Sequence, residues 1–317
     1  MVVSTEVEMT EGLPRIGLAL GSGAARGWAH IGVIKALKEA GVEPGIVCGA
    51  SIGALVGGAY ASGQLEPFEA WVRRLTWRDV IRYMDVQLTG GGFIEGERLL
   101  EFARRYAGDV QIESLPKAFS AVATELSKGQ EVWLQTGSLL DAVRASCALP
   151  GLFSPMNMGG RWLADGGLVN PVPVSLCRAM GAEVVIAVNL NGDIVGRHFR
   201  VERPSSSKAS TEQEESDFLG RLHAALSNGF RAKAEEMVSS LMGSNKTPGM
   251  FDVLSSALNI MQDRITRSRM AGDPPDIMLA PRLAHIGLLE FHQAEVAIAS
   301  GEQAVNHMLP AILDAIR

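Results

Sequence analysis

Strand-length apolar runs and helix-period patterns alternate along the first sixty residues. Arg15–Leu20 has the length and apolar content of a strand, and apolar side chains recur at helical spacing over Trp28–Leu37, before Gly41. Ile46–Cys48 follows as a second strand and Ile52–Ala61 as a second helix. Because strands alternate with helices, the pattern predicts a parallel sheet with right-handed crossovers.

The same patterns continue to the C-terminus, and we expect a three-layer α/β/α fold with a mostly parallel central sheet over residues 15–317. Residues 1–14 carry acidic side chains and are expected to form a flexible N-terminal tail. Further strands are expected at Phe119–Glu125, Glu131–Gln135, Glu183–Leu190 and Asp276–Leu279, and further helices at Glu97–Tyr106, Leu139–Ala145 and Gln293–Ile312.

Residues 202–216 differ from the rest of the domain because they contain hardly any apolar side chain, which is typical of a polar linker or loop. Two helical patterns follow within residues 217–270, one over Leu219–Leu241 and one over Leu254–Ile265. Each has apolar residues at i, i+3 and i+4 spacing and therefore one apolar face. That face either completes the core or belongs to a separate lid-like segment.

Charge and cysteine usage restrict the class of protein. The net charge of −6 and the absence of a Lys/Arg block argue against binding nucleic acid. The three cysteines are widely spaced, without a disulfide framework or metal-ligand spacing, as in a reducing cytosol. The N-terminus lacks the pattern of a secretory signal, and glycines interrupt the apolar stretch Pro44–Pro67. We therefore expect a cytoplasmic protein, at most peripheral to the inner face of the membrane.

A G-x-S-x-G segment, Gly49–Gly53, stands between the second predicted strand and helix. A nucleophile elbow requires this context, because glycines allow the sharp turn that exposes the serine, here Ser51. The helix N-terminus also favours developing negative charge. In an apolar run of small residues, the same glycines are equally explained by tight packing of a helix on a sheet.

The glycine-rich segment Gly21–Gly27 also follows a strand and opens a helix, so its backbone N–H groups favour an anion. A dinucleotide fingerprint fails because Arg26 occupies the third glycine position and no acidic residue ends the second strand. A Walker loop fails because no Gly-Lys-Ser/Thr is present. An oxyanion hole with donors from Gly23 and Ala24 remains, with a plain tight turn as the alternative.

The topology joins these two segments into one predicted site. If the first two strands are parallel neighbours, both loops leave the sheet at its carboxyl edge, where open α/β folds bind ligands. A carbonyl attacked by Ser51 would then face the donors of the first loop.

Ser51 needs a group that accepts its proton, and Asp165 is the better candidate. It follows an apolar run and precedes Gly166 and Gly167, as does a carboxylate held at a tight turn. The alternative is an Asx-turn residue without a catalytic role. None of the six histidines lies in a distinctive motif, and His30 is expected to be structural or exposed.

The ordered segments resemble those of patatin-like phospholipases, most fully the bacterial branch related to neuropathy target esterase. The resemblance rests on Gly21–Gly27, Gly49–Gly53, Ala145–Pro150 and Asp165–Gly167, and it extends to Met270–Asp276. The sequence departs from the family pattern at Ser22 and Ala24, where many members have glycine. Backbone donors survive both changes, although the loop becomes stiffer.

The resemblance implies a patatin-like fold and a Ser51–Asp165 dyad without histidine, metal or cofactor. It implies ester hydrolysis on phospholipids, lysophospholipids or other fatty-acyl esters, with transient contact at a membrane surface. Two alternatives are an α/β-hydrolase with a Ser–Asp–His triad and a non-catalytic lipid-binding or scaffold protein. The sequence does not predict the oligomeric state. The implied oxyanion residues are Gly21, Gly23 and Ala24, and the supporting residues are Arg26, Gly27, Gly49, Gly53, Gly166 and Gly167.

Overall fold

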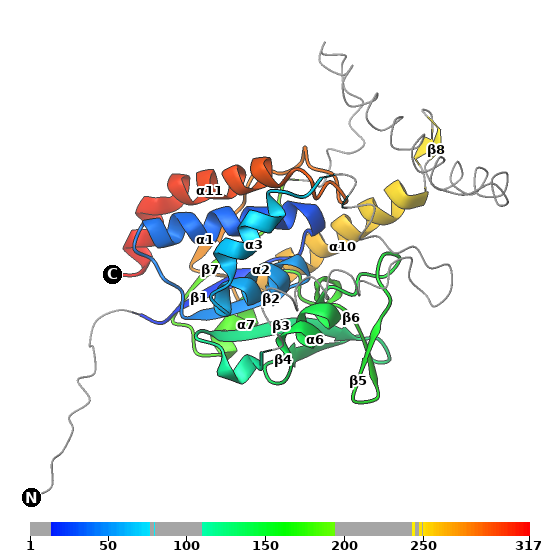
Figure 1. Ribbon diagram of the computed structural model, residues 1–317, viewed down its shortest axis with the longest axis horizontal. Helices are drawn as coiled ribbons and strands as arrows, with labels where there is room; N and C mark the ends of the chain where they lie inside the picture. Colours follow the sequence, from blue (N-terminus) through cyan, green and yellow to red (C-terminus); the bar gives the residue numbers. More distant parts are fainter. Residues whose placement is uncertain (1–13, 77–78, 80–109, 194–242, 245–246, 249) are drawn as a thin grey trace, which may run out of the picture. The chain divides into compact units, whose positions relative to one another are not determined.

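The computed structural model describes residues 14–76, 79, 110–193, 243–244, 247–248 and 250–317 (Figure 1). The described residues up to Asp193 and from Gln262 onward belong to one compact unit, and Ile194–Met261 belong to a second. In the second unit, the described residues form the short strands β8 (Gly243–Ser244) and β9 (Thr247–Pro248) and the start of helix α10 (Met250–Gly272). The candidate site lies in the first unit.

The first unit is built on an eight-stranded sheet in the order β10-β7-β1-β2-β3-β6-β5, with β4 also paired to β3. The pairs β10–β7, β7–β1, β1–β2 and β2–β3 are parallel, whereas β4, β5 and β6 pair antiparallel. The expected mostly parallel sheet is therefore confirmed. The strands are β1 (Ile16–Leu20), β2 (Ile46–Ala50), β3 (Ala118–Glu125), β4 (Gln130–Leu134), β5 (Met156–Met158), β6 (Arg161–Asp165), β7 (Val184–Val188) and β10 (Ile277–Leu279).

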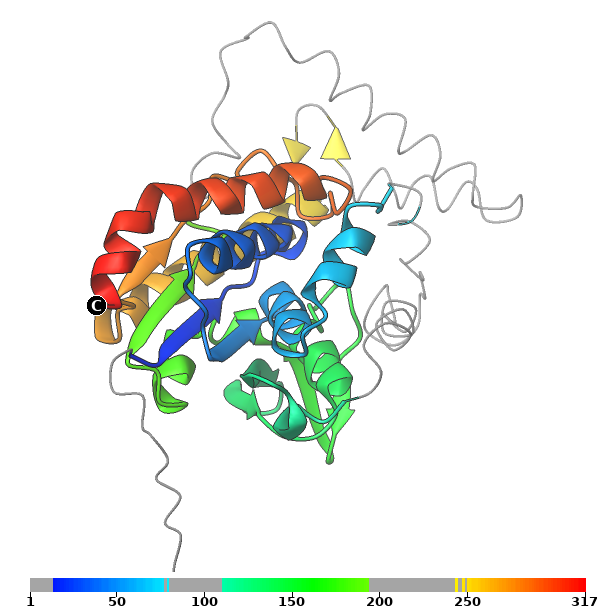
Figure 2. The ribbon, with the colours of Figure 1, turned by 60° about the vertical axis from the view of Figure 1, so that its left-hand side comes forward.

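Helices cover both faces of this sheet, and α11 lies alongside α1 in both ribbon views (Figures 1 and 2). Successive strand residues point to opposite faces. Thus Leu18 and Leu20 of β1 pack with α1, α2 and α11, whereas Ala19 packs with α7. The helices are η1 (Ala24–Trp28), α1 (Ala29–Glu39), α2 (Ile52–Ala61), α3 (Leu65–Val72), η2 (Ile112–Ser114), α6 (Leu139–Ser146), η3 (Gly166–Leu168), α7 (Val174–Ala179) and α11 (Ala294–Ala315).

Most predicted elements are confirmed, with bounds shifted by a few residues. The sequence patterns did not predict α3, β5, β6 or α7. Of these, β5 has only 3 residues and α7 only 6, and segments of that length are too short to show a period. The expected helices at Glu97–Tyr106 and Leu219–Leu241, the linker 202–216 and most of the N-terminal tail lie outside the described residues.

The predicted helix Leu254–Ile265 is confirmed within α10, but the alternative in which its apolar face completes the core is not. Leu254 and Met261 of that apolar face are 58% and 48% exposed. The buried positions of the helix are instead polar: Asn259, Gln262, Asp263 and Thr266. A polar face is buried only where it finds hydrogen-bond partners, and those of Gln262 are described below.

One edge of β3 brings two distant segments of the chain together. Val122 of β3 pairs with Ala50 of β2, and the next residue, Ala123, pairs with Asp165 of β6. Since β4 pairs with Ala121–Glu125 on one edge, β2 and β6 must share the other edge. The end of β2, which leads into Ser51, therefore meets the end of β6 at Asp165.

Candidate active site

Ser51 lies at the sharp turn between β2 and α2, as a nucleophile elbow requires. Its backbone has φ 56° and ψ −125°, a region that residues other than glycine rarely occupy. Among the described residues, only Ser51 and Ala24 are non-glycine residues with positive φ, and Ala24 has φ 48°. Such backbone strain is typical of functional sites and costs about 1–3 kcal/mol per residue. Both strained residues lie in the two predicted site loops.

Ser146 holds the serine turn in this conformation. The N–H of Ser51 donates a hydrogen bond to Ser146 Oγ at 2.9 Å, and the Ser146 hydroxyl donates to the carbonyl oxygen of Val122 at 2.6 Å. Ser146 is fully buried at the end of α6. It is a site residue that the motif reading missed, although it lies in the segment Ala145–Pro150.

The two loops pack directly against each other because glycines leave no side chain between them. A Cβ added to Gly27 would stand 2.1 Å from the Ile52 side chain, and a Cβ added to Gly53 would stand 2.2 Å from the carbonyl oxygen of Leu20. Neither contact is possible with a larger residue at the present spacing. The prediction that the loops after β1 and β2 meet at one sheet edge is confirmed.

The N–H groups of the first loop divide into two sets. Gly21 donates to the Val188 carbonyl at 3.1 Å and Ser22 donates to the Pro171 carbonyl at 2.8 Å, so both hold the loop in place. The N–H of Gly21, which the resemblance implies as part of the oxyanion hole, is therefore already bonded. The N–H groups of Gly23 and Ala24 have no acceptor among the residues that the structure describes. These two donors are therefore available to an anionic oxygen.

Two buried basic side chains hold the carbonyl oxygens of the same loop. His30 Nε2 donates to the Gly21 carbonyl at 2.8 Å, and Arg26 Nε donates to the Gly23 carbonyl at 3.2 Å. Burial lowers the pKa of His30 to about 4, so its ring is neutral at physiological pH. Burial also lowers the pKa of Arg26, to about 10, although nearby Asp193 opposes that shift. The expectation that His30 is structural agrees with this placement.

Asp165 ends β6 and is fully buried. Its Oδ1 accepts a hydrogen bond from the N–H of Gly167 at 2.7 Å, and Gly166 and Gly167 begin η3. Burial raises the pKa of Asp165 to about 6, while the Ser51 hydroxyl and the Gly167 N–H lower it by smaller amounts. Asp165 Oδ2 accepts no hydrogen bond of ordinary geometry from a described residue, but the Ser51 hydroxyl is close enough to lower the pKa of Asp165.

Cys147 lies beside this pair, at the end of α6. Burial raises the pKa of its thiol, and the Asp165 carboxylate adds to the shift, while the Ser51 hydroxyl and Arg144 oppose it. The thiol therefore stays neutral and is a poor nucleophile. As expected, Cys48, Cys147 and Cys177 are all free.

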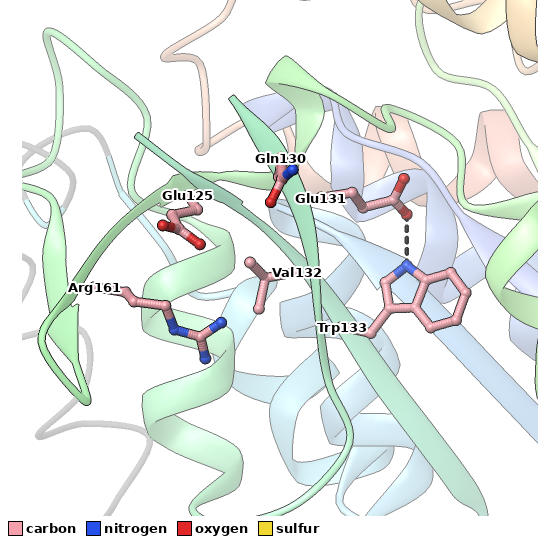
Figure 3. A pocket seen from close by; sticks show the side chains of 6 residues that line it. All are labelled: Glu125, Gln130, Glu131, Val132, Trp133 and Arg161. Atoms are coloured by element: carbon pink, nitrogen blue, oxygen red, sulfur yellow. Dashed lines mark hydrogen bonds between the residues drawn. The ribbon is translucent and has the colours of Figure 1, made fainter. Parts of the chain in front are cut away.

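A polar pocket at the β4 edge of the sheet does not contain the predicted site residues (Figure 3). Its carboxylates are already bonded: Glu125 pairs with Lys128 at 3.2 Å, and Glu131 accepts from Trp133 Nε1 at 2.7 Å and Arg269 at 2.6 Å. We therefore assign no chemistry to it. Its lining residues are Glu125, Gln130, Glu131, Val132, Trp133 and Arg161.

Comparison with known proteins decides the family. The model of the patatin-like phospholipase family matches residues 18–178, which include both loops and Asp165. The chain belongs to the patatin-like phospholipase family. An NTE family protein of Mycobacterium tuberculosis is 35% identical to this family member, over 94% of this chain and 92% of its own length. The resemblance to the NTE-related branch is therefore confirmed.

Other relatives are longer than this patatin-like chain. A second NTE family protein of Mycobacterium tuberculosis is 28% identical and the match covers 95% of this chain but 48% of that protein. Lysophospholipase nte1 of Emericella nidulans is 35% identical, over 55% of this chain and 12% of its own length. Among solved structures, VipD of Legionella pneumophila has 15% identity and a TM-score of 0.47, covering 93% of this chain and 66% of VipD.

Family membership supports lipid hydrolysis as the class of activity, with lipids as substrates. In the part of the chain that the structure describes, no helix has the length and apolar content needed to cross a bilayer.

Proposed function

We propose that this protein is a serine lipid acyl hydrolase that cleaves carboxylic esters through a Ser51–Asp165 dyad and an acyl-enzyme intermediate. The observation that carries the proposal is the convergence of three features at one sheet edge. The first is the strained turn at Ser51, and the second is the buried Asp165 carboxylate beside the Ser51 hydroxyl. The third is the pair of N–H groups of Gly23 and Ala24, which have no acceptor among the described residues.

In the acylation step, Asp165 accepts the Ser51 hydroxyl proton while the serine oxygen attacks the ester carbonyl. The pKa of about 6 lets Asp165 be ionised at neutral pH yet remain a stronger base than an ordinary carboxylate. The N–H groups of Gly23 and Ala24 stabilise the negative charge on the carbonyl oxygen, and loss of one such donor typically slows turnover by about 10²–10³. The tetrahedral intermediate then expels the alcohol, which takes up the proton from Asp165.

In the deacylation step, water attacks the acyl group on Ser51 and Asp165 accepts its proton. The fatty acid leaves as the serine oxygen recovers a proton. Both steps use the same base and donors, so the proposal requires no metal or cofactor. We assign Arg26, Gly27, Gly49, Gly53, Gly166 and Gly167 to the support of this geometry.

A Ser–Asp–His triad has less support. Asp165 bonds Gly167 and its pKa responds to Ser51, and within the described part of the chain no histidine is among the groups that shift it. His30 uses Nε2 to hold Gly21 and has a pKa of about 4, so it is a poor base at neutral pH.

We infer that the substrates are phospholipids, lysophospholipids or other fatty-acyl esters. The family match and the relative called lysophospholipase nte1 support this class. Such substrates lie in bilayers or micelles, so transient contact with a membrane surface is part of the proposal. A cytoplasmic location, peripheral to the inner face of the membrane, fits the three free thiols.

Turnover of a chromogenic short-chain ester and of lysophosphatidylcholine by purified wild-type protein and Ser51→Ala tests the proposal. We expect hydrolysis by wild type and loss of it in the variant, with unchanged melting. Binding of lipid without turnover by wild type would instead identify a non-catalytic lipid-binding protein.

A further inference from the structure

The side-chain amides of Asn191 and Gln262 form a buried pair between the first loop and the turn that follows Asp165. Asn191, just after β7, is 3% exposed, and Gln262 of α10 is 4% exposed. The Nδ2 group of Asn191 donates to the Gln262 Oε1 atom at 2.9 Å and to the Ser22 carbonyl oxygen at 3.3 Å. One amide group therefore binds α10 and the loop of the proposed oxyanion donors at once.

These bonds fix the direction of the Gln262 amide. Because Oε1 accepts from Asn191, the Nε2 group must point the other way. A Cβ added to Gly167 would stand 2.6 Å from Gln262 Nε2, 2.9 Å from Ser22 Oγ and 3.0 Å from Asp165 Oδ1. The amide nitrogen of Gln262 therefore packs against Gly167, beside Ser22 and the proposed base.

Each end of this pair reaches a group that positions a reacting atom. Ser22 directly precedes Gly23, one of the two proposed oxyanion donors. Gly167 donates its N–H to Asp165 Oδ1 at 2.7 Å, and this bond orients the carboxylate. Gln262 and Asn191 thus connect the loop of the proposed oxyanion donors to the turn that holds the proposed base.

We propose that Gln262 is a positioning residue for catalysis, which acts with Asn191 to set the distance between the oxyanion donors and Asp165. This inference rests on the proposed function. It also explains why α10 buries a polar residue at this point: the Gln262 amide bonds Asn191 and packs against Gly167. Small displacements between reacting groups slow enzymes strongly, so the effect is expected in kcat.

The test compares Gln262→Met and Gln262→Glu with wild type. Gln262→Met keeps the length of the side chain but removes both amide contacts, and we expect kcat to fall about tenfold or more with KM within about twofold. Gln262→Glu keeps an acceptor for Asn191 and brings a negative charge toward Asp165. The acid limb of the pH–rate profile should therefore move to higher pH, because a like charge disfavours ionisation of Asp165. Cys147, directly after α6, is a titratable neighbour of Asp165, and its thiol stays neutral, so it does not obscure this shift.

Thr266→Val serves as the matched control, because Thr266 is also 4% exposed and lies one helical turn further along the buried face of α10. A purely structural role for Gln262 predicts that Gln262→Met and Thr266→Val lower the melting temperature alike and leave kcat and the pH profile unchanged. That result would overturn the inference.

A second readout separates this inference from the proposed function. The rate of Ser51 labelling by a fluorophosphonate reports activation of the nucleophile in each protein, including variants that bind substrate weakly. Labelling that is fast in wild type and Thr266→Val and slow in both Gln262 variants supports the positioning role. Equal labelling rates in all four proteins would overturn the positioning role of Gln262 and leave the proposed function standing. A wild-type protein that is neither labelled nor active would overturn both.

Discussion

The loop Gly21–Gly27 and the turn Gly49–Gly53 leave neighbouring parallel strands at the same edge of the sheet, and each holds one non-glycine residue at positive φ. In the first loop the strained residue is Ala24, whose methyl group has no role in the proposed chemistry. In the second it is Ser51, whose side chain is the proposed nucleophile. A positive φ thus presents a backbone N–H group at Ala24 and a side-chain hydroxyl at Ser51.

The difference lies in what holds each strained residue. Ser51 is held by a side chain, since its N–H donates to the buried hydroxyl of Ser146. The loop with Ala24 is held at residues next to Ala24. The N–H groups of Gly21 and Ser22 donate to carbonyl oxygens, and the side chains of His30 and Arg26 donate to the carbonyl oxygens of Gly21 and Gly23. Substitutions at Ser51 should therefore remove function, whereas substitution of Ala24 by glycine should preserve it.

The largest effect is expected for Ser51 itself. Ser51→Ala and Ser51→Gly should both lose ester hydrolysis, because the nucleophile is gone. They should differ in stability, because glycine occupies φ 56° and ψ −125° with less strain: Ser51→Gly should be more stable by about 1 kcal/mol. Equilibrium urea unfolding compares the two variants. Equal stabilities would show that the turn relaxes when the hydroxyl is absent.

Asp165→Asn should be nearly as damaging to activity and should stabilise the fold. General-base loss typically lowers rates by about 10²–10⁴, so kcat/KM should fall in that range. In wild type, kcat/KM should decline as the pH falls through about 6, because Asp165 becomes protonated. A kcat/KM of Asp165→Asn within threefold of wild type would contradict the dyad and favour a histidine triad.

The stability effect of Asp165→Asn has a defined sign. The pKa of Asp165 rises from 3.8 to about 6 on folding, so the folded protein binds more protons than the unfolded chain between these values. Wild-type stability therefore decreases as the pH rises through this window, by about 3 kcal/mol in total. Asp165→Asn avoids this loss, so its advantage in urea unfolding should be largest at pH 8 and absent near pH 4. A pH-independent difference would contradict the raised pKa.

Removal of the Ser146 hydroxyl should have a smaller effect on activity. Ser146→Ala leaves the Ser51 N–H without its acceptor, and an unsatisfied buried donor costs about 1–3 kcal/mol. We expect kcat to fall about tenfold because the turn is less well held. Ser120→Ala is the control, since Ser120 is equally buried and bonds the Leu134 carbonyl instead. If both variants keep full kcat, Ser146 has no part in positioning Ser51.

The smallest effect is expected at Ala24. Ala24→Gly relieves the strain of a Cβ at φ 48° but raises the entropy of the unfolded chain, so stability should rise by less than about 1 kcal/mol. Activity should stay within about twofold, because the backbone N–H remains. A tenfold loss would show that the Ala24 methyl contributes to the site. Steady-state kinetics and urea unfolding give both values.

Sequence patterns were sufficient for the parallel part of the fold and for the order of the site segments. Glycine spacing around Ser51 and the apolar run of β7 each depend on neighbours close in the chain, so local reasoning reached them. Strands β5 and β6 at the antiparallel end were less readable, because β5 has only 3 residues and the apolar side chain of Trp162 in β6 is 56% exposed, so apolar content does not mark the buried face.

The residues that sequence reasoning missed are those whose role depends on contacts between distant segments. Ser146 meets Ser51 across 95 positions, and Asn191 meets Gln262 across 71. Gln262 lies within the predicted helix Leu254–Ile265, and only the structure shows that its side chain bonds Asn191 and packs against Gly167. No periodicity in one sequence carries this information.

Mass analysis of the protein during turnover tests the central claim most directly. Wild-type protein mixed rapidly with a long-chain ester and quenched in acid should carry one acyl group, on the peptide that contains Ser51. The adduct should be absent from Ser51→Ala and should accumulate far more slowly in Asp165→Asn. Hydrolysis by wild type with the acyl group on another residue, or retained hydrolysis by Ser51→Ala, would contradict the account.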